Sequence, residues 1–217
     1  MKFSAIIVAA GEGSRFGGPK QFVMAAGKTL LEHALEPFVG AVDQIIVVMS
    51  PAVLPDINRY ISNPDLLETL DLVEGGDSRS ESVRKGLAAL DESCEVVLIH
   101  DGARPLVSVE VIERVKASVV SGASAVVPVT PLSETLYSVE AEALDRSQYR
   151  LAQTPQGFRK QVLKEAHSGP HTATDDATLA IEAGYEVSLV DGDIENRKVT
   201  FPFDIAAIEY CLNRRQG

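Results

Sequence analysis

The feature that most constrains the fold is an apolar run, Ala5 to Ala10, that leads without a break into the glycine-rich stretch Gly11 to Gly18. A run with no polar interruption is typical of a strand buried on both faces of a parallel sheet. The glycine-rich stretch is then a loop at the carboxyl end of that strand. Ligands of open α/β sheets bind at this edge, where loops present backbone N–H groups and helix N-termini to anions.

Two common phosphate-binding loops do not fit this stretch. The dinucleotide fingerprint G-x-G-x-x-G would start at Gly11 and Gly13, but Phe16 occupies the position of its third glycine. The P-loop matches in its glycine spacing, from Gly13 to Gly18. However, Pro19 follows where that loop needs a backbone donor.

The loop carries two cations, Arg15 and Lys20, with no charged residue between them. Such a pair is suited to hold a triphosphate. The string A-A-G-E-G-S-R-F-G-G-P-K-Q, from Ala9 to Gln21, resembles the signature loop of the sugar-phosphate nucleotidyltransferases, and more narrowly that of the polyol-phosphate cytidylyltransferases. Within that family the resemblance is closest to members that use 2-C-methyl-D-erythritol 4-phosphate. A structural glycine turn is the alternative interpretation of the loop taken alone.

The rest of the chain alternates predicted strands and helices. Strands are predicted over residues 44–49, 70–73, 96–100, 125–129 and 186–190, and helices over 30–39, 52–61, 78–90, 109–120, 159–166, 176–183 and 203–214. This rhythm predicts a single α/β domain over residues 1–217, doubly wound, with a mostly parallel Rossmann-like sheet and right-handed crossovers.

The segment from Thr130 to Tyr149 breaks this rhythm. It is polar and acidic with short alternating stretches, which predicts a β-hairpin that leaves the main sheet. A hairpin of this length is marginal alone and is expected to pack against something. The resemblance implies that this arm, residues 130–150, reaches into a twofold-related subunit of a homodimer. A loose surface excursion is the alternative.

Charge and cysteine content narrow the class of partners. The net charge of −11 and the pI of about 4.8 argue against nucleic-acid binding, which needs a broad basic surface. An acidic chain that binds a polyanion needs a local cationic pocket and, in our interpretation, a divalent metal.

The two cysteines, Cys94 and Cys211, predict neither a disulfide framework nor a zinc site, and fit a reducing cytoplasm. No apolar segment is long enough to span a membrane.

A second motif, H-D-G-A-R-P from His100 to Pro105, follows the strand predicted at 96–100. Asp101 is therefore expected beside the glycine loop, where one carboxylate can hold Mg²⁺ together with substrate phosphates. The motif is similar to the family's second motif, and we assign Asp101 to Mg²⁺ and the nucleotide, and Arg104 to the phosphate region. Helix capping or ion pairing is the alternative. His100 is predicted to be structural.

The resemblance also implies the remaining site residues. The nucleotide set is Ala9, Ala10, Gly11, Gly13, Gly76, Asp77, Ser82 and Asp101, and the acceptor set is Arg104, Thr135, Arg146, Thr154 and Lys198. Thr135 and Arg146 would act in the neighbouring subunit's site, and Asn196 is a further candidate metal ligand. Backbone carbonyls near Gly76 can accept from the exocyclic amine that distinguishes cytosine from uracil. Asp175 and Asp176, which start a predicted helix, are expected to be structural.

The resemblance implies a reaction in non-mevalonate isoprenoid precursor synthesis. A phosphate oxygen of 2-C-methyl-D-erythritol 4-phosphate would attack the α-phosphorus of CTP, and pyrophosphate would be released. Catalysis is assigned to Arg15, Lys20, Arg146 and Lys198, which would bring two anions together and stabilise charge. One alternative is ribitol 5-phosphate as the acceptor. Another is a nicotinamide-dependent oxidoreductase. Phe16 disfavours it, and so does Ser50, which occupies the position where a ribose-binding acid would be expected. The third is a non-catalytic nucleotide-binding module.

Overall fold

The structure, a computed structural model, describes residues 1–169 and 173–216. It is built on one large sheet with the strand order β10-β7-β11-β6-β1-β4-β5, and a further strand, β12, pairs with β7. These strands are β1 (Phe3–Ala9), β4 (Gln44–Met49), β5 (Leu70–Glu74), β6 (Val96–Asp101), β7 (Ala125–Pro131), β10 (Arg150–Ala152), β11 (Gln156–Arg159) and β12 (Val187–Asp191). Only β10 and β11 run antiparallel to their neighbours. The prediction of a mostly parallel α/β sheet is confirmed.

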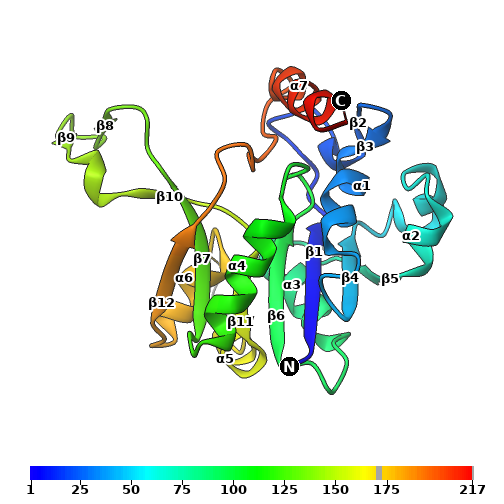
Figure 1. The fold of residues 1–217 in the computed structure, drawn as a ribbon, viewed down its shortest axis with the longest axis horizontal. Helices are drawn as coiled ribbons and strands as arrows, with labels where there is room; N and C mark the ends of the chain where they lie inside the picture. Colours follow the sequence, from blue (N-terminus) through cyan, green and yellow to red (C-terminus); the bar gives the residue numbers. More distant parts are fainter. Residues whose placement is uncertain (170–172, 217) are drawn as a thin grey trace.

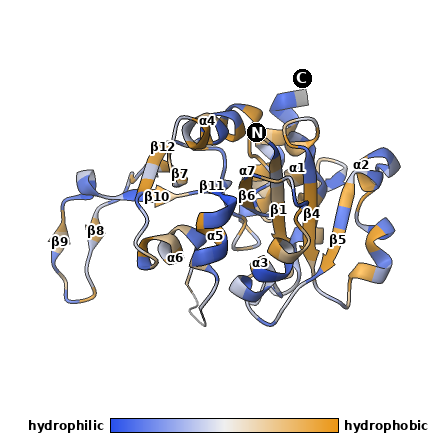
Figure 2. Ribbon diagram, turned by 90° about the horizontal axis from the view of Figure 1, so that it is seen from below, coloured by the Kyte–Doolittle hydropathy of each residue, from blue (hydrophilic) through white to orange (hydrophobic). Residues whose placement is uncertain are grey.

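Helices cover both faces of this sheet (Figure 1). On one face pack α1 (Leu30–Leu35) and α4 (Val109–Val120), and on the other α3 (Arg79–Ala88), α5 (Lys160–Ala166) and α6 (Asp176–Glu182). Successive side chains of a strand point to opposite faces, so Ile7 joins the first core and Ile6 the second. This two-sided burial explains why β1 and β4 are apolar almost throughout (Figure 2).

The C-terminal helix α7 (Asp204–Gln216) packs beside a small hairpin of β2 (Met24–Ala25) and β3 (Lys28–Thr29). A third core cluster, which includes Leu30, Leu106, Val199 and Ile208, joins these parts. Val199 is fully buried in it. The packing therefore fixes the chain just before α7 close to the carboxyl edge of the sheet, and Lys198 with it.

The remaining helices are short. They are α2 (Pro64–Glu68) and the 3₁₀ helices η1 (Lys20–Phe22), η2 (Glu36–Phe38), η3 (Leu54–Arg59) and η4 (Arg146–Gln148). The helix predicted over 52–61 is thus only the 3₁₀ turn η3, interrupted by the non-helical backbone of Asp56. Within the described ranges, no helix combines the length and apolar character that crossing a membrane requires.

The predicted arm is present. β8 (Leu136–Tyr137) and β9 (Ala143–Leu144) form a hairpin outside the main sheet, and it projects to one side of the molecule (Figure 1). The prediction of a hairpin that leaves the sheet is confirmed.

Sequence analysis missed the two antiparallel strands β10 and β11 that follow the arm. Each is short, and their pairing with β7 and β6 is decided by tertiary packing rather than by local pattern. Gly157 in β11 marks this packing, because a Cβ there would lie 2.5 Å from Val115 Cγ1 of α4. The glycine lets α4 approach the sheet closely.

Candidate active site

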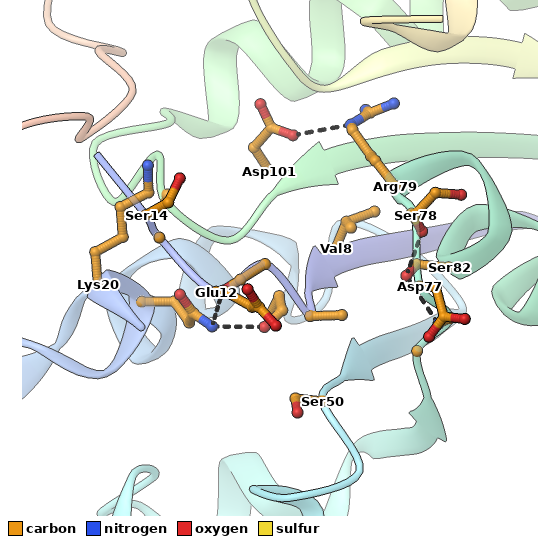
Figure 3. A pocket seen from close by; sticks show the side chains of 18 of the residues that line it. Val8, Glu12, Ser14, Lys20, Ser50, Asp77, Ser78, Arg79, Ser82 and Asp101 are labelled. Carbon is orange, nitrogen blue, oxygen red and sulfur yellow. Dashed lines mark hydrogen bonds and ion pairs between the residues drawn. The ribbon is translucent and has the colours of Figure 1, made fainter. Parts of the chain in front are cut away.

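A cavity of about 680 Å³ opens where four neighbouring strands end. β1 continues into the glycine loop, β4 ends before Ser50, β5 ends before Gly75, and β6 ends at Asp101; all of these segments line the cavity. Figure 3 shows these walls with Lys20, Asp77, Arg79 and Asp101 around the same space. Arg15, Lys20, Asp101 and Lys198 also share this lining. The cavity thus gathers three of the four cations assigned to catalysis, Arg15 and Lys20 from one end of the chain and Lys198 from the other.

The glycine loop is a folded turn around one carbonyl. The oxygen of Gly13 accepts from the N–H groups of Phe16, Gly17 and Gly18, at 2.8, 3.0 and 3.3 Å. Gly13 has a φ of +67°, and a Cβ there would lie 1.9 Å from the oxygen of Gly18. No other residue type therefore fits at this position without opening the turn.

The side chain of Gln21 ties the start of the loop to its end. Its Nε2 donates to the carbonyls of Ala9 and Gly11, at 2.7 and 3.1 Å, and it is 4% exposed. The loop is therefore anchored at its base, while its middle, with Arg15, is exposed to the cavity and solvent.

Positive charge is concentrated on the loop side of the cavity. Burial lowers the pKa of Lys20, and the nearby charges of Lys198 and Arg15 lower it further, against the opposing effect of Asp101. Like charges held together in this way repel one another until an anion binds. The pocket thus supplies the local cationic site that a chain of net charge −11 needs to bind a polyphosphate.

Asp101 lies among three cations. Lys198 Nζ is 2.8 Å from its Oδ2, Arg104 Nε is 3.6 Å from the same oxygen, and Arg79 Nε is 3.4 Å from Oδ1. Burial disfavours the charged carboxylate, but these three neighbours outweigh it and hold the pKa of Asp101 far below its usual value. Asp101 is therefore an anion at any physiological pH.

A buried hydrogen-bond chain fixes the backbone at Asp101. The Asp101 N–H donates to Thr154 Oγ1 at 3.1 Å, which lies 2.9 Å from His100 Nδ1, and His100 Nε2 lies 3.2 Å from the Arg104 carbonyl. The carbonyl can only accept, so His100 donates through Nε2 and accepts at Nδ1 from the threonine hydroxyl. Burial lowers the pKa of His100 to about 4. The prediction that His100 is structural is confirmed.

The predicted nucleotide-binding residues all border the cavity; they are Ala9, Ala10, Gly11, Gly13, Gly76, Asp77, Ser82 and Asp101. The turn after β5 is held from beneath, because the Gly76 N–H donates to Ser82 Oγ at 3.1 Å and Lys85 Nζ donates to the Gly75 carbonyl at 2.8 Å. Glu81 accepts from the Asp77 N–H at 3.0 Å. The turn therefore has a fixed shape before any base binds.

Three predicted ligand-binding residues lie outside the cavity lining and make hydrogen bonds within the protein. Thr154 is 4% exposed and belongs to the hydrogen-bond chain below Asp101. Arg104 donates to the carbonyls of Asn196 and Ala152, at 2.9 and 3.3 Å. Asn196 is 0% exposed and donates through Nδ2 to the Thr154 carbonyl at 2.8 Å, while its buried Oδ1 has no hydrogen-bond partner among the described residues. Within one chain these side chains form a supporting layer below the cavity, and their contacts with a substrate or, for Asn196, with a metal stay predictions.

Two further predicted residues lie on the arm. Thr135 and Arg146 are exposed, neither borders the cavity, and the Arg146 guanidinium donates to the Ser133 carbonyl. Within one chain they are not brought together with Lys20 or Lys198.

Sequence analysis missed Arg79, which borders the cavity and is the first residue of α3. Its guanidinium contacts Asp101 on one side and Asp176 on the other. The available signal was its position directly after Ser78, whose side chain caps α3 by accepting from the Glu81 N–H. A residue that starts a helix at this edge of the sheet points toward the ligand site.

Comparison with known proteins agrees with this geometry. The family model described as 2-C-methyl-D-erythritol 4-phosphate cytidylyltransferase matches residues 3–214. The chain belongs to this family. An enzyme of that name from Cereibacter sphaeroides is 43% identical over 100% of both chains, and one from Streptomyces avermitilis is 38% identical over 98% of this chain and 92% of its own. The crystal structure of the Thermus thermophilus enzyme superposes with a TM-score of 0.83 at 36% identity and covers 98% of this chain and 100% of its own.

Membership in the 2-C-methyl-D-erythritol 4-phosphate cytidylyltransferase family confirms the predicted enzyme class, a CTP-dependent nucleotidyltransferase, and the predicted reaction. It excludes the oxidoreductase and the non-catalytic module as interpretations of the chain, and favours methylerythritol phosphate over ribitol phosphate as the acceptor.

Proposed function

We propose that this cavity brings CTP and 2-C-methyl-D-erythritol 4-phosphate together for direct cytidylyl transfer. An oxygen of the acceptor phosphate forms a bond to the α-phosphorus of CTP, and the bond from that phosphorus to the bridging oxygen of pyrophosphate breaks. The observation that carries the proposal is that Arg15, Lys20 and Lys198 border one cavity with Asp101. No general base is needed, because the attacking phosphate is already an anion near neutral pH.

The glycine loop is the proposed triphosphate site. Its middle, which carries Arg15, is exposed to the cavity, and Lys20 follows directly after the loop. Negative charge grows on the leaving pyrophosphate during transfer, and preorganised cations stabilise it most where burial excludes water. Lys20 is the half-buried member of the pair, and we assign the larger share of this stabilisation to it.

The turn from Gly75 to Ser82 is the proposed cytosine site. It stands at the end of β5, on the far side of the cavity from Lys20 in Figure 3. The Gly75 carbonyl is already occupied by Lys85. We assign recognition of the exocyclic amine of cytosine to the Gly76 carbonyl and the carboxylate of Asp77, which border the cavity beside Gly75.

Mg²⁺ fits the same site as a proposed cofactor. Among the described residues no group of three or more His, Cys, Asp or Glu side chains could hold a metal by itself. Asp101 is a single ionised carboxylate on the cavity wall, and Mg²⁺ commonly binds through one or two carboxylates plus substrate phosphates. When bound, the metal would neutralise charge on the phosphate oxygens, while Asp101 holds it against the wall.

The arm supports a homodimer as part of the same proposal. Its two strands have two residues each, and Tyr137 and Val139 are 61% and 98% exposed. A hairpin of this size with exposed apolar side chains gains stability by packing on another subunit. There, Thr135 and Arg146 would reach the acceptor phosphate in the partner's cavity, because a guanidinium suits phosphate oxygens.

A cytoplasmic location is also proposed. Both cysteines are free, with Cys94 buried and Cys211 partly so, which suits a reducing compartment.

The direct test is an assay of pyrophosphate release by the purified protein. With CTP, Mg²⁺ and 2-C-methyl-D-erythritol 4-phosphate we expect stoichiometric release, and far slower release when ribitol 5-phosphate replaces the acceptor at equal concentration. Equal or faster turnover of ribitol 5-phosphate would contradict the assignment of the acceptor.

Subunit mixing tests the arm. The variants Lys20→Met and Arg146→Met are each expected to be nearly inactive. Heterodimers formed by refolding an equal mixture carry one site with both wild-type residues, so about a quarter of wild-type activity is expected to return. If both residues act within one chain, mixing restores nothing.

A further inference from the structure

Asp176 is a buried anion that the reaction described above does not use. It is the first residue of α6 and is 0% exposed. Its Oδ1 lies 3.0 Å from His167 Nε2, and its Oδ2 lies 2.8 Å from Arg79 Nη2. Burial disfavours its charge, but the hydrogen bond from His167 and the charge of Arg79 outweigh burial and lower the pKa of Asp176. Sequence analysis predicted only a structural role for this residue.

Arg79 connects Asp176 to the cavity. Its guanidinium lies between two carboxylates, with Nη2 at 2.8 Å from Asp176 and Nε at 3.4 Å from Asp101. The closer contact is the one to Asp176. Asp176 therefore anchors the guanidinium, whose hydrogen bond to Asp101 is a long one (Figure 3).

The two oxygens of Asp101 are unequally engaged as a result. Oδ2 is 2.8 Å from Lys198 Nζ and 3.6 Å from Arg104 Nε, whereas the one side-chain hydrogen bond to Oδ1 from the residues that the structure describes is the long one from Arg79 Nε, at 3.4 Å. A free arginine prefers to meet a carboxylate with two parallel contacts of about 2.8 Å. Without its anchor, Arg79 would be able to take this geometry and occupy Oδ1.

We propose that Asp176 is a positioning residue that holds Arg79 back from Asp101 and so leaves Oδ1 of Asp101 for the divalent cation that accompanies CTP. The inference rests on the metal role of Asp101 in the proposed function. Asp176 itself would touch neither the substrate nor the divalent cation, because it is fully buried behind Arg79. Residues that orient a metal ligand from behind commonly control metal affinity as strongly as some ligands do.

The test is the Mg²⁺ dependence of CTP binding by Asp176→Asn, measured by titration calorimetry without acceptor so that no turnover occurs. The substitution keeps the shape and the acceptor for His167 and removes the charge that anchors Arg79. We expect the Mg²⁺ concentration for half-maximal CTP binding to rise on the order of tenfold. At saturating Mg²⁺, CTP affinity is expected to remain near that of wild type.

A matched control is Asp175→Asn at the preceding position. Asp175 caps α6 by accepting from the Thr178 N–H at 3.0 Å and accepts from Gln156 at 2.9 Å, whereas the ion pairs of Arg79 with described residues are those with Asp101 and Asp176. Its Mg²⁺ dependence is expected to equal that of wild type. A shift as large as that of Asp176→Asn would show a general effect of the helix start and overturn the inference.

The double variant Asp176→Asn with Arg79→Gln removes both buried charges. It provides a second test, which can also be used if the single variant does not fold. No arginine then competes for Oδ1, so half-maximal CTP binding is expected at or below the wild-type Mg²⁺ concentration. A requirement raised as much as in the single variant, or on the order of tenfold above wild type, overturns the inference.

Asp101→Asn separates this inference from the proposed function. If its Mg²⁺ dependence equals that of wild type, the metal role of Asp101 fails and the inference fails with it. If Asp101→Asn changes the dependence and Asp176→Asn does not, only the positioning role of Asp176 is overturned.

Discussion

The two cationic walls of the cavity are built differently. On the glycine loop, Arg15 is exposed and makes no ion pair with any residue that the structure describes, and Lys20 lies among like charges. Around Asp101, every cation is paired with a carboxylate before a ligand arrives. The positive charges of the loop are therefore stabilised only when an anionic substrate binds. The Asp101 wall contributes to the stability of the fold as well as to the site.

The largest expected effect comes from the loop. Lys20→Met is expected to lower kcat/KM on the order of 10²–10³-fold, because it removes a cation from the developing charge on pyrophosphate. Steady-state kinetics with CTP and the acceptor measures this. Arg15→Met, which removes the exposed cation, is expected to follow in the same direction.

Thermal unfolding of the same variants sharpens the contrast. Burial and like charges disfavour the ammonium of Lys20, so Lys20→Met is expected to unfold at or slightly above the wild-type temperature. Unchanged activity in both loop variants would remove the catalytic role of the loop cations.

Asp101→Asn is expected to lower the free energy of unfolding by about 3 kcal/mol as well as activity, because breaking a buried ion pair leaves uncompensated charge. Here that charge is carried by Lys198, Arg79 and Arg104. Urea unfolding measures the loss. A variant as stable as wild type would show that this wall is no more preorganised than the loop.

The third expected effect is a pH dependence carried by His100. Its pKa falls from 6.5 to about 4 on folding, so between these values the unfolded chain binds a proton that the folded chain does not. The free energy of unfolding therefore decreases as pH falls from 6.5 to 4, by about 3 kcal/mol at 1.36 kcal/mol per pKa unit. The lowered pKa values of Asp101 and Asp176 act in a separate window, since the stability they add is lost only below about pH 4.

His100→Asn removes this group and is the test. The variant is expected to be less stable at pH 7, where the loss of packing dominates, but to lose less stability than wild type between pH 6.5 and 4. Urea unfolding across this range gives both slopes. Parallel slopes would mean that His100 does not stay neutral in the fold.

The parts of the site that could be predicted from sequence are those with a local signal. The apolar run before Gly11 marks a buried strand, and Asp101 follows another such strand, so both fall at one edge of a parallel sheet. That reasoning needs no knowledge of distant contacts. It explains why the loop and the position of Asp101 were predicted in the places where the structure has them, whereas the turn at Gly76 was assigned from the family resemblance.

The parts that could not be predicted depend on which direction a side chain takes. Arg104 stands three residues after Asp101, and nothing local shows that its guanidinium turns toward carbonyls of Asn196 and Ala152 rather than toward the cavity. The pair of Arg79 and Asp176 joins α3 to α6, which are distant in the sequence. Such contacts are fixed by the packing of whole helices against the sheet.

The smallest expected effect concerns Lys85, a cation that is bonded before the ligand binds, at the proposed cytosine site. Lys85 is an exposed cation whose Nζ donates to the Gly75 carbonyl at 2.8 Å. Lys85→Met is expected to raise the KM for CTP about fivefold with little change in kcat, because one hydrogen bond contributes about 1 kcal/mol. Lys85→Arg keeps a donor and is expected to retain most of the wild-type KM. If both variants raise KM equally, the hydrogen bond does not shape the turn. If kcat falls instead, Lys85 acts on the transferred group. A cation that is already bonded before the ligand binds would then take part in catalysis away from Asp101 as well.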